Sequence, residues 1–198
     1  MVKVCYVIYF ESVKTMVKVC YVIHGWDFNP KMNWYPWIKR ELEGKGFKVV
    51  ILEMPDTSVP VIKLWVDKLK DSVKSEGEIY FIGHSIGCQT IMRYLETLDV
   101  EVRGALFVAG WFNLANLEDE EVEQIAKPWI KESINLFKVK ERIDNLKVIL
   151  SDNDPYNYVK ENADKFRREL GAEVRIEHNK EHFIGKKYPE ILPEFLKL

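Results

Sequence analysis

A five-residue turn between an apolar strand and an amphipathic helix constrains this chain more than any other feature. Residues 79–82 (IYFI) form a short apolar run that favours β-structure, typical of a strand buried on both faces. Over residues 86–98 the apolar residues recur at three- and four-residue spacing, which predicts an amphipathic helix. The turn between them is Gly83-His84-Ser85-Ile86-Gly87. A buried strand that leads directly into a helix indicates an α/β protein with a parallel sheet.

The turn matches the pattern G-x-S-x-G, in which a serine hydroxyl projects above the sheet on a sharp strand-to-helix turn. Gly83 and Gly87 fit because a Cβ atom at either position would crowd a strained Ser85 backbone. The start of the helix adds unpaired N–H groups and the positive end of its dipole. Ser85 is therefore the candidate nucleophile, and the Ile86 N–H is a candidate oxyanion donor. The alternative is a purely structural strand-to-helix turn.

Strand and helix patterns alternate along the rest of the chain. Strands are predicted at 17–23, 47–54, 79–82, 102–109, 147–151 and 173–177, and helices at 33–44, 60–73, 86–98, 156–170 and 189–198. Strands separated by helices join through right-handed crossovers into a parallel sheet. We predict an α/β fold with a mostly parallel six-stranded sheet and helices on both faces.

The length of 198 residues suits one domain, which we place at 16–198. Within it, 111–143 breaks the alternation, and we expect this segment to form a lid or pocket wall. The octapeptide MVKVCYVI occurs at 1–8 and again at 16–23. Residues 1–15 are either a spare edge strand that pairs with a second chain in a homodimer, or an upstream extension without function. We favour the second interpretation because the remaining chain forms a complete unit.

Composition argues against several classes of partner. The formal net charge of −2 and the lack of a basic tract argue against nucleic-acid binding. No apolar run approaches the length of a membrane span, and the N-terminus lacks the features of a signal peptide. Three cysteines in a chain of this length argue against a disulfide framework and for a reducing, cytoplasmic setting.

An activated serine requires a base, and the chain offers four histidines. His84 neighbours the serine, so its side chain diverges from the hydroxyl. His24 ends a strand and is expected to shape the loop after it. His178 continues the alternating pattern of the last strand, which indicates a structural role. His182 lies on a loop after that strand, where α/β-hydrolases carry their catalytic histidine, and it is the predicted base.

The acid that orients this base is expected between the serine and the histidine in sequence. The segment Ser-Asp-Asn-Asp-Pro at 151–155 follows a strand and precedes a helix. Asp154 adjoins Pro155 in a stiff turn suited to holding a carboxylate, and Asp152 is the second candidate.

A second oxyanion donor should come from the loop after the first strand of the domain. Gly25 allows close approach of the backbone there, and we expect the Trp26 N–H to be the donor, with Gly25 as the second choice. Substrate contacts are expected from His24, Trp111 and Trp129, although the aromatic residues fit the core equally well.

The segments VIHGWDFNP, NWYPWIKRELEGKGFKVVILEMP, GHSIG, SDNDPY and HFIG, taken together, resemble the small α/β-hydrolases of the retinoblastoma-binding protein 9-like serine hydrolase family. The resemblance extends over nearly the whole chain from residue 16. It implies a minimal α/β-hydrolase fold, a triad of Ser85, Asp154 and His182, and hydrolysis of small esters or amides without a metal or cofactor. Glu181 departs from the family, whose members often have glycine before the histidine.

Three other functions compete with this interpretation. Residues 178–182 spell H-x-x-E-H, an inverted zinc-protease motif that requires a helix and a third ligand. The fold can also occur in a catalytically silent protein that binds partners or ligands. Cys88, in the first turn of a helix, is a candidate redox thiol, although a small core residue is the more ordinary interpretation.

Overall fold

The structure is a computed structural model, and it describes residues 16–74, 76–97, 101–117 and 119–198. The first MVKVCYVI copy and its proposed pairing with a second chain lie outside the described residues. In the part of the chain that is described, no helix has both the length and the apolar character required to cross a lipid bilayer.

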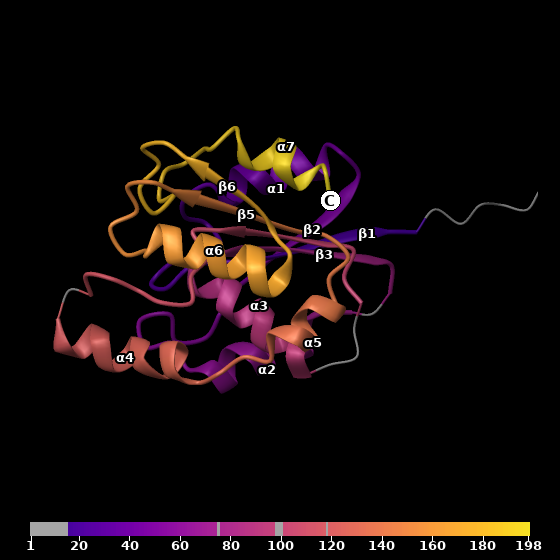
Figure 1. Ribbon diagram of the computed structural model, residues 1–198. Coiled ribbons are helices and arrows are strands. Elements are labelled where there is room, and N and C mark those ends of the chain that lie inside the picture. Colours follow the sequence, from indigo (N-terminus) through magenta and orange to yellow (C-terminus); the bar gives the residue numbers. More distant parts are fainter. Residues whose placement is uncertain (1–15, 75, 98–100, 118) are drawn as a thin grey trace, which may run out of the picture.

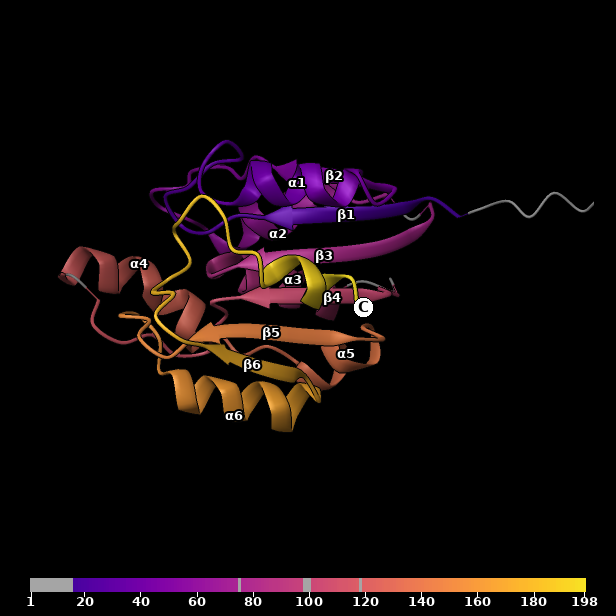
Figure 2. The same cartoon turned by 90° about the horizontal axis from the view of Figure 1, so that it is seen from above.

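The centre of the fold is a six-stranded sheet in which every pair of neighbouring strands is parallel, so the predicted α/β fold is confirmed. Its spatial order is β2-β1-β3-β4-β5-β6. The strands are β1 (Lys18–Ile23), β2 (Phe47–Leu52), β3 (Glu78–His84), β4 (Gly104–Val108), β5 (Leu146–Ser151) and β6 (Glu173–Glu177). The parallel pairing places all their carboxyl ends on the same side of the molecule, as the arrowheads of β1, β5 and β6 show in Figure 2.

Helices cover both faces of the sheet, as Figure 1 shows. They are α1 (Tyr35–Glu43), α2 (Ile62–Ser72), α3 (Ile86–Thr97), α4 (Glu120–Lys131), α5 (Leu136–Glu141), α6 (Val159–Leu170) and α7 (Ile191–Phe195). One face carries α1 and α7, and the opposite face carries α2, α3, α5 and α6. The last helix is shorter than the predicted 189–198.

Strand β3 shows why the sheet is buried on both sides. Ile79 and Phe81 belong to the apolar cluster beneath α2 and α3, whereas Tyr80 and Ile82 belong to the cluster beneath α1 and α7. Successive side chains of a strand point to opposite faces, so a continuous apolar run supplies both cores. Strand β3 lies in the interior of the sheet, so the residues that follow it lie at the middle of the carboxyl edge. Ligand sites of open parallel sheets occur at this edge.

The segment 111–143 departs from the simple alternation as expected. It contains α4 and α5, and α4 lies beyond the carboxyl ends of the strands in Figure 2. Asp119 caps α4 by accepting a hydrogen bond from the Val122 N–H, and three glutamates occupy the first turn of the helix. Both features stabilise a helix N-terminus. Asp119 and these glutamates therefore account for where α4 begins.

Candidate active site

The turn after β3 holds Ser85 in a left-handed backbone conformation, with φ of 53°. Such a conformation is uncommon for residues other than glycine and is found at functional turns. A Cβ atom on Gly87 would lie 2.3 Å from the Ile23 carbonyl oxygen, and one on Gly83 would lie 2.9 Å from the Cys88 Cα. Both glycines are therefore required by close backbone approach, as the sequence pattern predicts.

Ser85 lies between the sheet and a cavity at the carboxyl edge. Its N–H donates to the Val108 carbonyl at 2.9 Å, which fixes the turn against β4. Its Oγ accepts a hydrogen bond from Trp111 Nε1 at 3.3 Å. Trp111 was expected to contact substrate, and nothing in the sequence indicates its hydrogen bond with the Ser85 hydroxyl. The serine is 7% exposed and lines this cavity.

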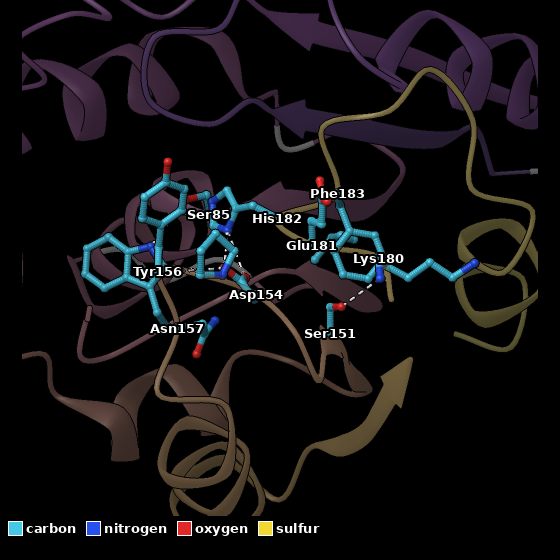
Figure 3. Close-up of polar contacts among 12 residues, drawn as sticks. Ser85, Ser151, Asp154, Tyr156, Asn157, Lys180, Glu181, His182 and Phe183 are labelled. Atoms are coloured by element: carbon cyan, nitrogen blue, oxygen red, sulfur yellow. Dashed lines mark hydrogen bonds and ion pairs between the residues drawn. The ribbon is translucent and has the colours of Figure 1, made fainter. Parts of the chain in front are cut away.

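His182 and Asp154 are paired. The His182 Nδ1 lies 2.8 Å from Asp154 Oδ2 and 3.0 Å from Oδ1, and the Asp154 side chain is fully buried. Asp154 Oδ1 also accepts the N–H of Tyr156, two residues ahead, so Pro155 sits in a turn closed by the carboxylate. In Figure 3 the His182 ring lies between the side chains of Asp154 and Ser85, and both His182 and Ser85 line the same cavity.

The second acid candidate, Asp152, has a different partner. Its Oδ2 contacts His178 Nδ1 and its Oδ1 accepts the Asn179 N–H, both at the surface. The Asn179 N–H and the histidine ring lower the pKa of this carboxyl. Strand β6 ends at Glu177, so His178 lies beyond the strand in which its alternation seemed to place it.

The H-x-x-E-H segment does not have the geometry of a zinc motif. Residues 178–182 form turns rather than a helix, and the two histidines pair with separate aspartates. In the described parts of the chain, no group of three or more histidines, cysteines or carboxylates is arranged to hold a metal ion. Cys88 is also unsuited to the redox alternative, because complete burial raises the pKa of its thiol.

The cavity in front of Ser85 has a volume of about 750 Å³. Helix α4 and the segment before it form one wall, the loops after β1 and β5 form others, and the loop containing His182 completes it. Its apolar lining includes Trp26, Phe28, Leu114, Val122, Ile125 and Ile184. Residues of α4 thus border this cavity, and a lid function of 111–143 stays a prediction.

The candidate oxyanion donors differ in availability. Ile86 is the first residue of α3, so its N–H has no acceptor within the helix. The Gly25 N–H donates to the Tyr35 hydroxyl at 3.1 Å and is therefore occupied. This contact argues against Gly25 and leaves the N–H of Trp26, a residue that lines the cavity, as the candidate for the second donor.

The structure places two predicted substrate-binding residues elsewhere. His24 is fully buried and does not line the cavity, and its Nε2 accepts the Met54 N–H, which joins the ends of β1 and β2. Trp129 is 1% exposed, donates from Nε1 to the Pro60 carbonyl and packs edge-on against Trp65. Neither side chain lines the cavity that contains Ser85, so the structure does not bring them to the site where substrate contact was expected.

Sequence reasoning missed the environment of His84. The ring is fully buried, stacks on Phe28, and has both nitrogens within hydrogen-bond distance of neighbours, Tyr35 Oη at 2.6 Å and the His182 carbonyl at 2.8 Å. Burial, and secondarily the nearby His182, lowers the pKa of His84 from its ordinary 6.5 to about 3. His84 is therefore neutral in the folded protein near pH 7.

This depressed pKa predicts a loss of stability in acid. Unfolded His84 binds a proton below about pH 6.5, whereas folded His84 binds it only near pH 3, so the free energy of unfolding falls between these values. Between pH 7 and pH 5 the loss from this residue is about 2 kcal/mol. Urea unfolding at both pH values checks it against His84→Gln, which has no titrating ring. An equal pH dependence in the two proteins would contradict the prediction.

The chain is similar to known serine hydrolases. A family model described as "Serine hydrolase" matches residues 20–195. The rat serine hydrolase RBBP9 is 26% identical over 161 residues, covering 80% of this chain and 82% of that protein. YdeN of Bacillus subtilis is 34% identical over 92 residues, an alignment that spans 45% of this chain and about half (48%) of YdeN.

Solved structures show the same fold. The ydeN gene product of B. subtilis superposes with a TM-score of 0.79 at 23% identity, covering 91% of this chain and 98% of that one. The B. subtilis carboxylesterase CesB superposes with a TM-score of 0.65 at 11% identity, covering 91% and 83%. The chain therefore belongs to the serine hydrolase family, and it is a hydrolase with the α/β-hydrolase fold.

Proposed function

We propose that the protein hydrolyses small esters or amides through an acyl-enzyme, with Ser85 as nucleophile, His182 as base and Asp154 as the orienting acid. One observation carries the proposal. The His182 ring is hydrogen-bonded through Nδ1 to the buried Asp154 carboxylate, and His182 borders the cavity that contains the strained Ser85. A nucleophile and a base held by a third group are the parts that such chemistry requires.

The orientation of His182 determines its role. Because a carboxylate only accepts hydrogen bonds, Nδ1 carries the proton and Nε2 is left with a lone pair that can accept the Ser85 proton. The serine oxygen then attacks the carbonyl carbon, and the protonated ring returns the proton to the leaving group. Asp154 stabilises the ring while it is positively charged. Water then attacks the acyl-enzyme with His182 again as the base, which releases the carboxylic acid product and restores Ser85. The proposed mechanism uses no metal or cofactor.

The oxyanion is proposed to bind at the N–H groups of Ile86 and Trp26. Ile86 begins a helix of twelve residues, so its free N–H and the positive end of the helix dipole favour negative charge there. Trp111 Nε1, which contacts Ser85 Oγ in the resting site, is a further donor close to the developing charge.

The lining of the cavity favours a small substrate that is uncharged or positively charged. Its walls are mainly aromatic and aliphatic, and Asp27, Asp119, Glu121 and Glu181 lie around them. No lysine or arginine occurs among the described residues that line it. An anionic substrate would meet like charge on entry. The description of CesB as a carboxylesterase also supports ester substrates.

The cellular setting is likewise a proposal. Cys20 and Cys88 are free thiols, which suits a reducing, cytoplasmic environment. We propose that the protein acts on small molecules rather than on nucleic acids or membranes. The molecular mass in solution tests the alternative of a homodimer through residues 1–15.

A fluorophosphonate probe tests the proposed function, because it reacts with activated serines only. We expect the folded protein to be labelled at Ser85, identified by mass spectrometry of the modified peptide, and heat-unfolded protein to remain unlabelled. A panel of nitrophenyl esters and aminoacyl amides then defines the preferred acyl group. A folded protein with no label on Ser85 would instead favour a catalytically silent hydrolase fold that binds a ligand or partner.

A further inference from the structure

A buried chain of hydrogen bonds connects the loop after β1 to the backbone of His182. The Gly25 N–H contacts Tyr35 Oη at 3.1 Å, Tyr35 Oη contacts His84 Nδ1 at 2.6 Å, and His84 Nε2 contacts the His182 carbonyl oxygen at 2.8 Å. Tyr35 and His84 are both fully buried. The chain therefore passes from the proposed oxyanion loop, through the residue before Ser85, to the loop of the proposed base.

Each link of the chain has only one direction. The His182 carbonyl can only accept, so His84 Nε2 must carry the hydrogen and donate it. A neutral imidazole then has an acceptor at Nδ1, so the Tyr35 hydroxyl must donate to it. That hydroxyl keeps a lone pair, which accepts the Gly25 N–H. No alternative proton arrangement satisfies all three contacts while His84 is neutral.

The loop that carries His182 needs such external support. Glu181 has φ of 51° and Phe183 has φ of 55°, so residues on both sides of His182 adopt the left-handed conformation that costs energy without glycine. Two donors hold this backbone from outside the loop. His84 bonds the carbonyl of His182, and Trp34 Nε1 bonds the carbonyl of Phe183 at 2.9 Å.

We propose that His84 and Tyr35 are positioning residues, which hold the His182 loop and the Gly25–Trp26 loop at a fixed spacing on either side of Ser85. This inference rests on the proposed function, because it concerns the same triad. Both nitrogens of His84 are occupied by Tyr35 and the His182 backbone, so the ring does not act on substrate. Breaking the chain should therefore slow turnover and leave substrate binding nearly unchanged.

Tyr35→Phe tests the inference, because it removes one hydroxyl and keeps the ring that packs on Trp34. We expect kcat for a nitrophenyl ester to fall about 10- to 100-fold, since small misplacement of a catalytic group has effects of this size. KM should change less than about threefold. Circular dichroism melting curves check that the variant is folded at the assay temperature.

Tyr188→Phe is the matched control. The Tyr188 hydroxyl accepts the Gly185 N–H at 2.9 Å and its ring packs on Phe183, so it supports the same loop without joining the chain. We expect its kcat to stay within about twofold of the wild type. A Tyr35→Phe variant with the wild-type kcat, or equal losses in both tyrosine variants, would overturn the inference.

A second pair of variants measures the link to the His182 carbonyl itself. His84→Gln can still donate an N–H to that carbonyl, whereas His84→Leu cannot, and we expect about tenfold higher kcat for His84→Gln. Equal kcat in the two would count against positioning. The fluorophosphonate experiment distinguishes failure of the proposed function from failure of the positioning inference alone. An unlabelled wild type overturns both. A labelled, active wild type with unaffected Tyr35 and His84 variants overturns only the inference.

Discussion

Ser85→Ala is expected to reduce ester hydrolysis by about 10⁴- to 10⁶-fold, the range found when a serine hydrolase loses its nucleophile. Without the hydroxyl no acyl-enzyme forms, and only the oxyanion donors and the cavity can assist attack by water. The fold should survive, because within the described part of the chain the hydroxyl loses one hydrogen bond, from Trp111 Nε1 at 3.3 Å. Initial rates with a nitrophenyl ester and a thermal melt measure both effects.

Ser58→Ala is the matched control for this substitution. Ser58 is exposed and lines the same cavity, and its carbonyl, which the substitution leaves in place, accepts the Trp26 ring N–H. We expect its activity to stay within about twofold of the wild type. If Ser85→Ala kept more than about a tenth of the wild-type rate, Ser85 would not be the nucleophile.

Asp154→Asn is expected to reduce kcat by about 10³- to 10⁴-fold while the protein stays folded. The amide can still accept the Tyr156 N–H, which preserves the turn at Pro155. It no longer holds His182 in the tautomer with the proton on Nδ1, and it brings no negative charge to stabilise the protonated ring. The kcat and the melting temperature of the purified variant are the measurements.

Asp152→Asn provides the comparison, because it makes the same chemical change two residues away. Asp152 pairs with His178 and the Asn179 backbone at the surface, and it does not contact His182. We expect its kcat to remain within about threefold of the wild type. If Asp152→Asn lost activity and Asp154→Asn did not, the acid of the triad would be reassigned to Asp152.

The parts of the site that are formed by neighbouring residues could be predicted from short sequence patterns. The strand, turn and helix around Ser85 follow from apolar periodicity and from two glycines that backbone contacts require. The choice of Asp154 followed from Pro155 and the turn chemistry of aspartate. These features are short-range, so their physical causes are contained in a few neighbouring residues.

Partners that are distant in sequence were harder to predict. His24 and Trp129 have the chemistry expected of substrate contacts. Tertiary packing instead places His24 against Trp65 of α2, and Trp129 of α4 against the same tryptophan. Nothing in the sequence around Tyr35 distinguishes its hydroxyl from that of any other helical tyrosine, yet the packing of α1 places it against His84.

The sequence alone determined the α/β architecture, the strained turn at Ser85, and one histidine and two aspartates suited to act with it. Only the tertiary structure decided which aspartate meets His182, which aromatic residues face the cavity, and that a buried hydrogen-bond chain through α1 and the end of β3 joins two loops. The physical reason is that periodicity and turn propensity act over a few residues, whereas these contacts join residues 10 to 98 positions apart and depend on how the loops pack at the sheet edge.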